Sequence, residues 1–406
     1  MGKARKDILS ANMDFTPEKE VYDRIGLFQD RLRAHEIDYA IIIQNVNVYY
    51  FTGSIQKSYL IIPADQKPLF IVQKDPNRAR TESPLPIIEM HSVKQLPDIL
   101  SSHGLDENKR VGLELDFLSV AIFNKLKNIV GYSDYADISS EVLKLRARKS
   151  SYELEQIKKS GKICDHVFSK VADYLDQGIS EVELSALLQA EGRRVGHQGI
   201  MRMRGLNQEL TNPHVLSGPC GAVSSFGDVP LCGCGMTPAV AQGASRRKIE
   251  PNEPVIIDYG GGYNGYITDE TRTYVLGNLD KTLQKAYALS LDILEYFQEN
   301  ACQGANGKLL FEQIESWVVK NRLDNNFMGY GPNRVSFVGH GIGLTLNELP
   351  VIAKNRDEIL NTGMVIAVEP KFVFPGQGAV GVEADFMVRT DKSERVTGFT
   401  TTIQYV

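Results

Sequence analysis

The order of apolar and polar residues predicts alternating helices and strands in the first third of the chain. Apolar positions recur at helical spacing in RIGLFQDRL, which begins at Arg24, and again over residues 118–130. Apolar runs and alternating stretches predict strands at residues 39–43, 59–62, 68–72 and 111–115. Strands that alternate with helices in this way are typical of an α/β domain.

A charged stretch near residue 150, LRARKSSYELEQIKKS, separates this part from a longer C-terminal part. It leads into a long helix with one apolar stripe, and further helices are predicted over 283–297 and 309–319. We therefore expect two domains, 1–150 and 151–406. The second is predicted to be an α+β domain, in which helices cover one side of a curved antiparallel sheet.

The C-terminal part contains a predicted hairpin that carries two carboxylates. The β-branched run 255–257 ends on Asp258, residues 271–275 form a second strand-like run, and a Gly/Asn-rich turn at 260–265 lies between them. Paired strands would present Asp258 and Asp269 to one point. Two carboxylates so placed repel each other, so either one is protonated or a cation lies between them.

Three more candidate ligands follow in the sequence. His340 lies between glycines in GHGIGLTLNELP, and neutral imidazole is the commonest metal ligand. Glu369 follows the apolar run of MVIAVEP, and Glu383 lies in AVGVEADFMV. Four carboxylates and one imidazole suit two divalent ions that share bridging carboxylates, because a metal pair neutralises the charge and activates a water. The ligand set does not select among manganese, cobalt, zinc and iron.

Taken singly, each of these residues is more often structural, but together they resemble a known family. The segments IIDYG, ITDETRTY, GHGIGL, GMVIAVEP and GVEADFMV are similar to the pita-bread metallopeptidases, which include methionine aminopeptidases, Xaa-Pro aminopeptidases, prolidases and creatinase. The resemblance implies a dinuclear site with the ligands Asp258, Asp269, His340, Glu369 and Glu383. It also implies a pita-bread C-terminal domain after a smaller creatinase-like α/β domain, which RIGLFQDRL and DYAIIIQNVNVYYFTG resemble.

The resemblance stops at the histidines that surround the metals in the family's proline-directed peptidases. The comparable places hold Ser336, Asn347 and Ala241. Serine and asparagine form hydrogen bonds but cannot exchange protons near neutral pH, and acid–base partners typically contribute about 10²–10⁴ in rate. A peptide hydrolase would therefore need another acid, for which Glu369 is the candidate and His214 a distant one.

Two hypotheses share this metal site. The first is a dinuclear metal-dependent hydrolase that cleaves a peptide bond next to proline or a related small amide, with Glu369 as proton carrier and Ser336 and Asn347 binding substrate. If residues 200–210 form a strand, Arg202 and Arg204 face one side of it and could hold a substrate carboxylate, although an arginine pair on a solvated or subunit-facing strand is commoner. The second is a non-peptidase of the same fold, a creatinase-like C–N hydrolase or a metal-dependent lyase acting on a small metabolite. The complete ligand set disfavours a catalytically silent binding protein.

Composition and charge narrow the remaining classes. The 406 residues, with a net charge of −5 and 42% apolar residues, describe an ordinary enzyme with nothing that favours nucleic acid. No apolar run reaches the length of a membrane span, and MGKARKDILSANMDF lacks a hydrophobic signal segment. We expect a cytoplasmic protein that acts on a small molecule or a short peptide and, by resemblance, a homodimer.

The cysteines raise one alternative metal site. The chain has five, an odd number that agrees with a reducing compartment. Cys220, Cys232 and Cys234 lie close together in sequence and invite a zinc site. Three sulfurs without CxxC spacing favour buried or free thiols instead.

Overall fold

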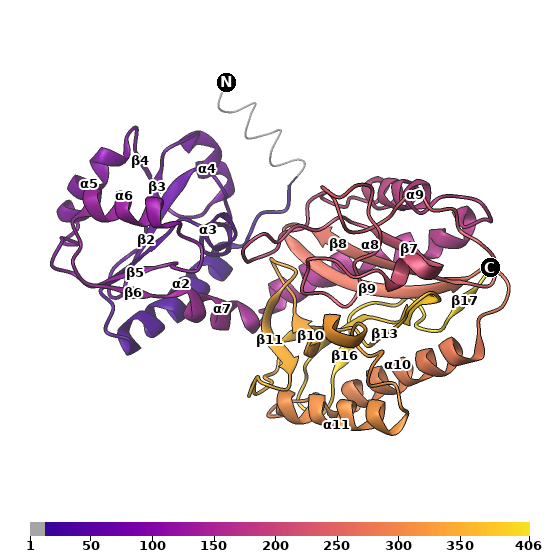
Figure 1. Cartoon of the computed structure of the whole chain (residues 1–406). Helices are drawn as coiled ribbons and strands as arrows, with labels where there is room; N and C mark the ends of the chain where they lie inside the picture. The colour runs from indigo at the N-terminus through magenta and orange to yellow at the C-terminus, as the bar shows by residue number, and fades with distance from the viewer. Residues whose placement is uncertain (1–12) are drawn as a thin grey trace. The chain divides into compact units, whose positions relative to one another are not determined.

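The computed structural model describes residues 13–406, which form two compact units that divide between Leu145 and Arg146 (Figure 1). The N-terminal unit contains a six-stranded sheet in the order β4-β3-β2-β1-β5-β6. Its strands are β1 (Tyr39–Ile42), β2 (Ser58–Pro63), β3 (Leu69–Val72), β4 (Ile87–Glu89), β5 (Val111–Leu113) and β6 (Tyr135–Asp137). Its helices are α2 (Glu18–Ala34), α3 (Asn45–Thr52), α4 (Pro76–Glu82), α5 (Leu96–Ser102), α6 (Val120–Val130) and α7 (Ser139–Ala147), the last of which crosses the division.

Helix α3 is one of the elements of this unit that the apolar pattern does not predict. Its sequence NVNVYYFT is rich in β-branched and aromatic residues, which are typical of a strand. Gln44 nevertheless caps the helix, because its side chain accepts a hydrogen bond from the Asn47 amide. Gly53, with a φ of 73°, ends it in the left-handed conformation that glycine adopts without strain. The two end signals override the strand propensity between them.

The C-terminal unit is built from two main sheets with helices outside them. One sheet has the order β17-β9-β8-β7, the other has the order β11-β10-β12-β15-β16, and β13 pairs with β14. The strands are β7 (His214–Ser217), β8 (Pro254–Tyr263), β9 (Tyr266–Val275), β10 (Phe337–Gly341), β11 (Glu348–Ala353), β12 (Val365–Val368), β13 (Lys371–Phe374), β14 (Gly378–Gly381), β15 (Ala384–Met387), β16 (Glu394–Arg395) and β17 (Gln404–Tyr405).

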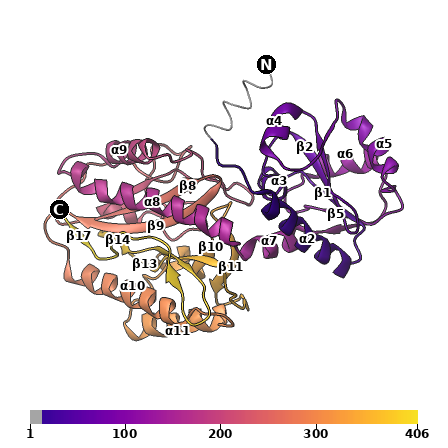
Figure 2. The ribbon, with the colours of Figure 1, turned by 180° about the vertical axis from the view of Figure 1, so that it is seen from behind.

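Four long helices cover these sheets: α8 (Ser151–Tyr174), α9 (Glu181–Arg194), α10 (Lys281–Asn300) and α11 (Gly307–Lys320). Helix α8 packs on β8 and β9 and α9 packs on β7, whereas α10 contacts β14 and α11 contacts β11. The views from front and back show these two helix pairs on opposite sides of the unit (Figures 1 and 2). Each pair shares an apolar core with the strands that it covers, so the strand surfaces between the sheets are left for polar side chains.

The β8–β9 hairpin is longer than the sequence predicts. Its turn is only Asn264-Gly265, whose φ values of 47° and 87° are typical of a type I′ turn. The glycines that the sequence places in the turn instead continue strand β8, where they permit close packing. A Cβ atom on Gly261 would lie 2.5 Å from the Thr268 hydroxyl oxygen and 2.6 Å from the main-chain oxygen of Ser160.

Strand β9 joins the two main sheets at one place. The Glu383 amide donates a hydrogen bond of 3.1 Å to the main-chain oxygen of Thr271. The Thr271 hydroxyl in turn donates to Glu383 Oε2 over 2.8 Å. The buried Arg272 guanidinium also donates to the main-chain oxygen of Glu383 over 2.7 Å. These bonds fix the segment before β15 against β9, so polar side chains from both sheets meet there.

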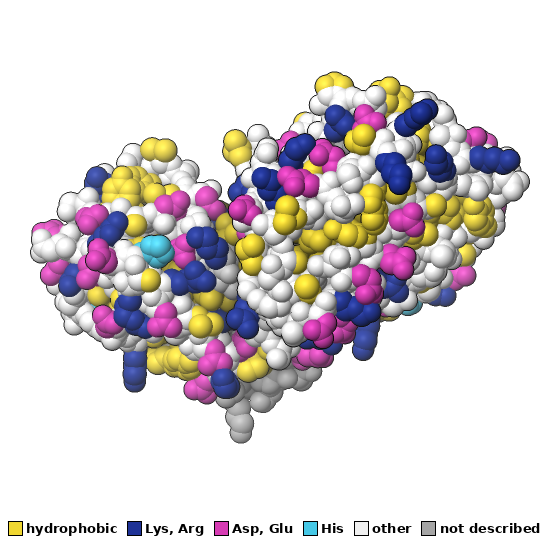
Figure 3. Space-filling view, turned by 90° about the horizontal axis from the view of Figure 1, so that it is seen from below, with side chains coloured by type: hydrophobic (Ala, Val, Ile, Leu, Met, Phe, Trp, Pro, Cys, Tyr) yellow, Lys and Arg dark blue, Asp and Glu magenta, His cyan; other side chains and the backbone are white. Residues whose placement is uncertain are grey.

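The surface carries both signs of charge. Over the face shown in Figure 3, basic and acidic side chains are interspersed, with apolar side chains between them. Among the helices of residues 13–406, none combines the length and the apolar character that crossing a membrane requires.

Replacing Gly261 with alanine tests the close packing of β8. We expect Gly261→Ala to lower the free energy of unfolding by about 1–3 kcal/mol, because the added methyl group meets a main-chain oxygen that cannot rotate away. Urea unfolding followed by tryptophan fluorescence reports on this unit, since Trp317 in α11 is the only tryptophan. Gly227→Ala is the control, because its methyl group would meet only Val229, at 3.4 Å. Equal midpoints for the two variants would contradict the packing account.

Candidate metal centre

The hairpin presents its two aspartates on one side of the sheet. Asp258 lies on β8 opposite Thr271, and Asp269 lies on β9 opposite Gly260. Because alternate residues of a strand share a face, Asp258 and Asp269 are diagonal neighbours on the same face. The structure therefore brings these two carboxylates together, while the glycine opposite Asp269 adds no side chain of its own.

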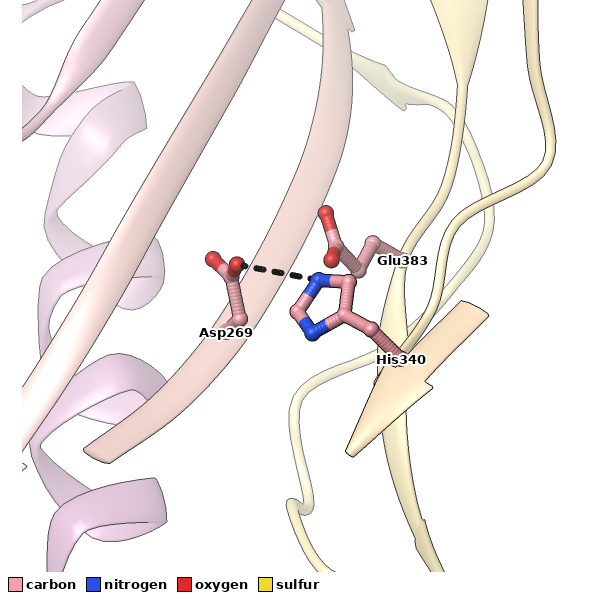
Figure 4. Close-up of side chains that lie close together, drawn as sticks. All are labelled: Asp269, His340 and Glu383. Carbon is pink, nitrogen blue, oxygen red and sulfur yellow. Dashed lines mark ion pairs between the residues drawn. The ribbon is translucent and has the colours of Figure 1, made fainter. Parts of the chain in front are cut away.

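Asp269, His340 and Glu383 converge from β9, β10 and the segment before β15 (Figure 4). One ligand atom from each lies within 4.8 Å of the others. His340 Nε2 is 4.0 Å from Asp269 Oδ2 and 3.7 Å from Glu369 Oε1. Two atoms bound to one ion at about 2.1 Å each are at most about 4.2 Å apart. Glu383 Oε1 is buried without a hydrogen-bond partner, so these residues fit one divalent ion.

A lysine that the sequence analysis did not single out lies among the remaining carboxylate oxygens. Lys371 Nζ donates hydrogen bonds to Asp258 Oδ2 at 3.1 Å, to Glu369 Oε2 at 2.8 Å and to Glu383 Oε2 at 2.8 Å. Its side chain is 2% exposed. The available signal was strand alternation, because a residue two positions after Glu369 projects to the same side in an extended chain.

Burial and charge shift the pKa values of this cluster in opposite directions. Burial raises the pKa of Asp269 well above its usual value, and the neighbouring carboxylates of Glu383 and Asp258 add to the rise. Burial and Glu369 raise the pKa of Glu383 to about 8, against the opposing charge of Lys371. Burial alone would lower the pKa of Lys371, but the surrounding carboxylates outweigh it and hold the pKa well above its usual value. One ammonium therefore does not balance four ionised carboxylates, so burial and mutual repulsion favour the protonated forms of Asp269 and Glu383.

His214, the distant candidate, lies beside the site. It begins β7 and pairs across the sheet with Asp258. Its Nε2 atom is buried without a hydrogen-bond partner, and burial lowers the pKa of the ring. Burial would raise the pKa of Asp258, yet Lys371 and His214 lower it below the usual value. The sequence predicts no strand at residues 214–217, so the pairing of His214 with Asp258 is not expected from it.

The predicted substrate-binding residues lie in less regular surroundings. Residues 200–210 form no strand, so the prediction that Arg202 and Arg204 share one face of a strand is wrong. Gly205 and Asn207 adopt φ values of 134° and 54°, which interrupt an extended chain. The Leu346 amide donates a hydrogen bond of 2.8 Å to the main-chain oxygen of Arg202.

Asn347 and Ser336 differ in how the chain holds them. The Asn347 amide group accepts a hydrogen bond from Arg204 N at 2.8 Å and donates one to Arg204 O at 2.6 Å. It therefore fixes the main chain of the segment that carries both arginines. Ser336 is exposed and comes directly before β10. A role for either residue in substrate binding stays a prediction.

Glu348 holds the loop that follows His340. It accepts hydrogen bonds from the amides of Leu344 and Thr345, and it forms buried ion pairs with Arg146 and with Lys149, the latter at 3.3 Å. Burial opposes ionisation, but the two cations outweigh it and lower the pKa of Glu348 to about 2. The loop between β10 and β11 is therefore tied to the start of this unit.

The cysteines do not gather into a metal site. Cys220, Cys232 and Cys234 are free, and the thiol of Cys220 lies 3.3 Å from Glu181 Oε2. Burial raises the pKa of the Cys220 and Cys232 thiols, which disfavours the thiolate form that zinc needs. Within residues 13–406, Asp269, His340 and Glu383 are the one group with metal-binding geometry.

Two family models match the chain. The model of metallopeptidase family M24 matches residues 155–390, more than half of the chain, and contains all five predicted ligands. The chain belongs to metallopeptidase family M24. The model of the creatinase/prolidase N-terminal domain matches residues 24–148. The predicted pita-bread family, its fold class and the metallopeptidase class of enzyme are thereby confirmed, and so is metal dependence as a property of the family.

Relatives in this family match more than nine tenths of the chain. A Xaa-Pro dipeptidase of Pyrococcus furiosus is 26% identical over 381 residues, which cover 93% of this chain and 98% of the relative. The structure of a Xaa-Pro dipeptidase from Bacillus anthracis matches with a TM-score of 0.81 at 22% identity, covering 95% of this chain and 100% of that one. That of an X-Pro aminopeptidase from Thermotoga maritima matches with a TM-score of 0.78 at 23% identity, covering 93% and 100%. The two-domain fold is therefore shared over more than nine tenths of the chain.

The pH dependence of stability tests the burial of Glu348. Because its pKa is depressed on folding, Glu348 stabilises the fold fully above about pH 4.5, and this contribution is lost as the pH falls toward 2. We expect Glu348→Gln to cost about 3–5 kcal/mol at pH 7, since Arg146 and Lys149 lose their partner. The difference from the wild type should stay constant from pH 7 to 5 and shrink below that.

Urea unfolding at a series of pH values, followed by Trp317 fluorescence, measures this difference. Glu315→Gln is the matched control, because it removes a carboxylate that pairs with Lys354 on the surface, where the side chains are 41% and 54% exposed. A surface pair contributes only about 0–1 kcal/mol. A cost for Glu348→Gln that equals the control, or that does not change down to pH 3, would refute the buried ion pairs.

Proposed function

We propose that this M24 protein is a metal-dependent hydrolase of the Xaa-Pro peptidase class, which cleaves a peptide bond next to proline or a related small amide. The observation that carries the proposal is the convergence of Asp269, His340 and Glu383 in one site. Support comes from relatives along the whole chain that bear the name Xaa-Pro dipeptidase, from Pyrococcus furiosus and Pyrococcus horikoshii.

Asp269, His340 and Glu383, with Glu369 Oε1 beside the imidazole, would hold a divalent ion. When bound, such an ion polarises a carbonyl and lowers the pKa of a water molecule. Glu369 can move the proton, because Lys371 bonds its Oε2 atom and leaves Oε1 on the side of His340. Oε1 would take a proton from the attacking water and give it to the leaving amine, which replaces the task of the missing histidines.

Substrate would be held by the segment that carries Arg202 and Arg204. A guanidinium group can bind a carboxylate with two parallel hydrogen bonds, as the free end of a dipeptide requires. Asn347 holds the main chain of this segment and so sets where the arginines project. Ser336, exposed before β10, would form a hydrogen bond to substrate near His340.

A second candidate function is a non-peptidase reaction of the same family, in which a C–N bond of a small metabolite is hydrolysed or eliminated. The places of the missing histidines favour it, because Ser336 and Asn347 cannot transfer protons at neutral pH. Turnover of a small metabolite that a chelator abolishes, without turnover of any X-Pro peptide, would select this reaction.

We further propose manganese, cobalt, zinc or iron as the metal, a homodimer as the assembly and the cytoplasm as the location. The ligand chemistry supports the choice of metals, because carboxylates and imidazole bind all four. Assembly and location stay predictions, which size-exclusion chromatography with light scattering and cell fractionation test.

Removing the imidazole tests the proposed activity. We expect His340→Ala to lower the turnover of X-Pro dipeptides by about 10² or more, because the loss of a metal ligand weakens both metal binding and the activation of water. Turnover is measured with metal added and again after treatment with a chelator. His91→Ala is the control, since His91 is exposed in the N-terminal unit and should leave turnover unchanged. Full activity of His340→Ala, or activity that persists with chelator, would contradict the proposal.

A further inference from the structure

The ammonium group of Lys371 lies where a second metal ion would be expected. Its three N–H groups meet three carboxylate oxygens, from Asp258, Glu369 and Glu383, at 3.1, 2.8 and 2.8 Å. We propose that Lys371 replaces one ion of the pair, so that the centre binds a single divalent ion beside a built-in ammonium. This inference rests on the metal dependence in the proposed function and deepens it.

The geometry leaves no separate place for a second ion among these oxygens. An ammonium has three donors, and each donor here has one carboxylate oxygen as its partner. A metal ion bound to the same three oxygens at about 2.1 Å would have to occupy the position of the ammonium itself. The ion that Asp269 and His340 would hold would use a different oxygen, the unpartnered Glu383 Oε1.

The charges of the site also favour a single divalent ion. The ligand carboxylates carry four negative charges, which two divalent ions would neutralise on their own. With Lys371 present, one divalent ion leaves a single negative charge, whereas two ions would leave a positive charge in a site that is almost fully buried. The two totals are equal in size, but a second ion would also lie close to the buried ammonium of Lys371, and like charges repel strongly in such surroundings, so the second ion is disfavoured.

Main-chain pairing and close packing of its stem hold Lys371 in this position. Lys371 begins β13 and pairs with Gly381 of β14. Its main-chain oxygen accepts a hydrogen bond of 2.8 Å from the Met328 amide. A Cβ atom on Gly381 would lie only 2.9 Å from Lys371 Cγ, so the glycine leaves room for the lysine stem. The side chain is only 2% exposed, so its ammonium is held among its three partners away from solvent.

Counting bound Mn²⁺ tests this proposal on the wild-type chain. Equilibrium dialysis against saturating Mn²⁺, followed by elemental analysis, should find one ion per chain. The electron paramagnetic resonance spectrum should show an isolated ion rather than an exchange-coupled pair. Mn²⁺ is a suitable probe because it prefers oxygen and nitrogen ligands to thiols. Two ions per chain, a coupled spectrum or no bound Mn²⁺ would overturn the proposal.

Removing the ammonium should open the second position. We expect Lys371→Ala to bind two Mn²⁺ ions, whereas the control Lys354→Ala, which removes an exposed lysine, should bind one. A folded Lys371→Ala chain that still binds one ion would also overturn the proposal, and if this variant does not fold, the wild-type count decides alone. The failure of this inference can be told apart from the failure of the proposed function. One bound ion without peptide turnover would refute only the proposed function, and two bound ions with peptide turnover would refute only this inference.

Discussion

Four carboxylates in one buried place are the constraint on which this structure depends. Asp258 and Asp269 lie on β8 and β9, Glu369 directly follows β12, and Glu383 directly precedes β15. Carboxylates so close repel one another unless positive charge lies between them. Lys371 supplies one such charge from within the chain. The imidazole of His340 and an oxygen of Glu383 that lacks a partner face the remaining space. A cation bound there would neutralise most of the negative charge that Lys371 alone does not balance.

The fold brings these charges together at a place where most of the side chains are buried. Apolar cores lie between each sheet and its helices, so the strand surfaces between the sheets can carry polar residues. The hairpin depends on glycines that let β8 approach β9 and α8 closely. Bonds from Thr271 and Arg272 to Glu383 then fix the second sheet against the first. Thr271 and Arg272 thus position the predicted ligand Glu383 without being predicted ligands themselves.

Much of this could be predicted from the sequence, because alternation and apolar runs mark strands wherever one face is buried. The hairpin with Asp258 and Asp269 follows from its β-branched runs, although its turn is shorter than expected because glycines serve packing as well as turns. Contacts between distant segments could not be predicted in the same way. The cross-strand pair of His214 with Asp258 and the bonds of Lys371 to Asp258 and Glu383 depend on which segments become neighbours, which no local pattern specifies.

The central claim is that this cluster holds a cation beside its lysine, and a crystal structure with Mn²⁺ tests it most directly. Anomalous scattering locates manganese independently of the protein atoms. The account predicts one peak among Asp269, His340 and Glu383, with the Lys371 ammonium still on Asp258 and Glu369. No peak at saturating Mn²⁺, or a peak in the place of the ammonium with the lysine turned away, would contradict it.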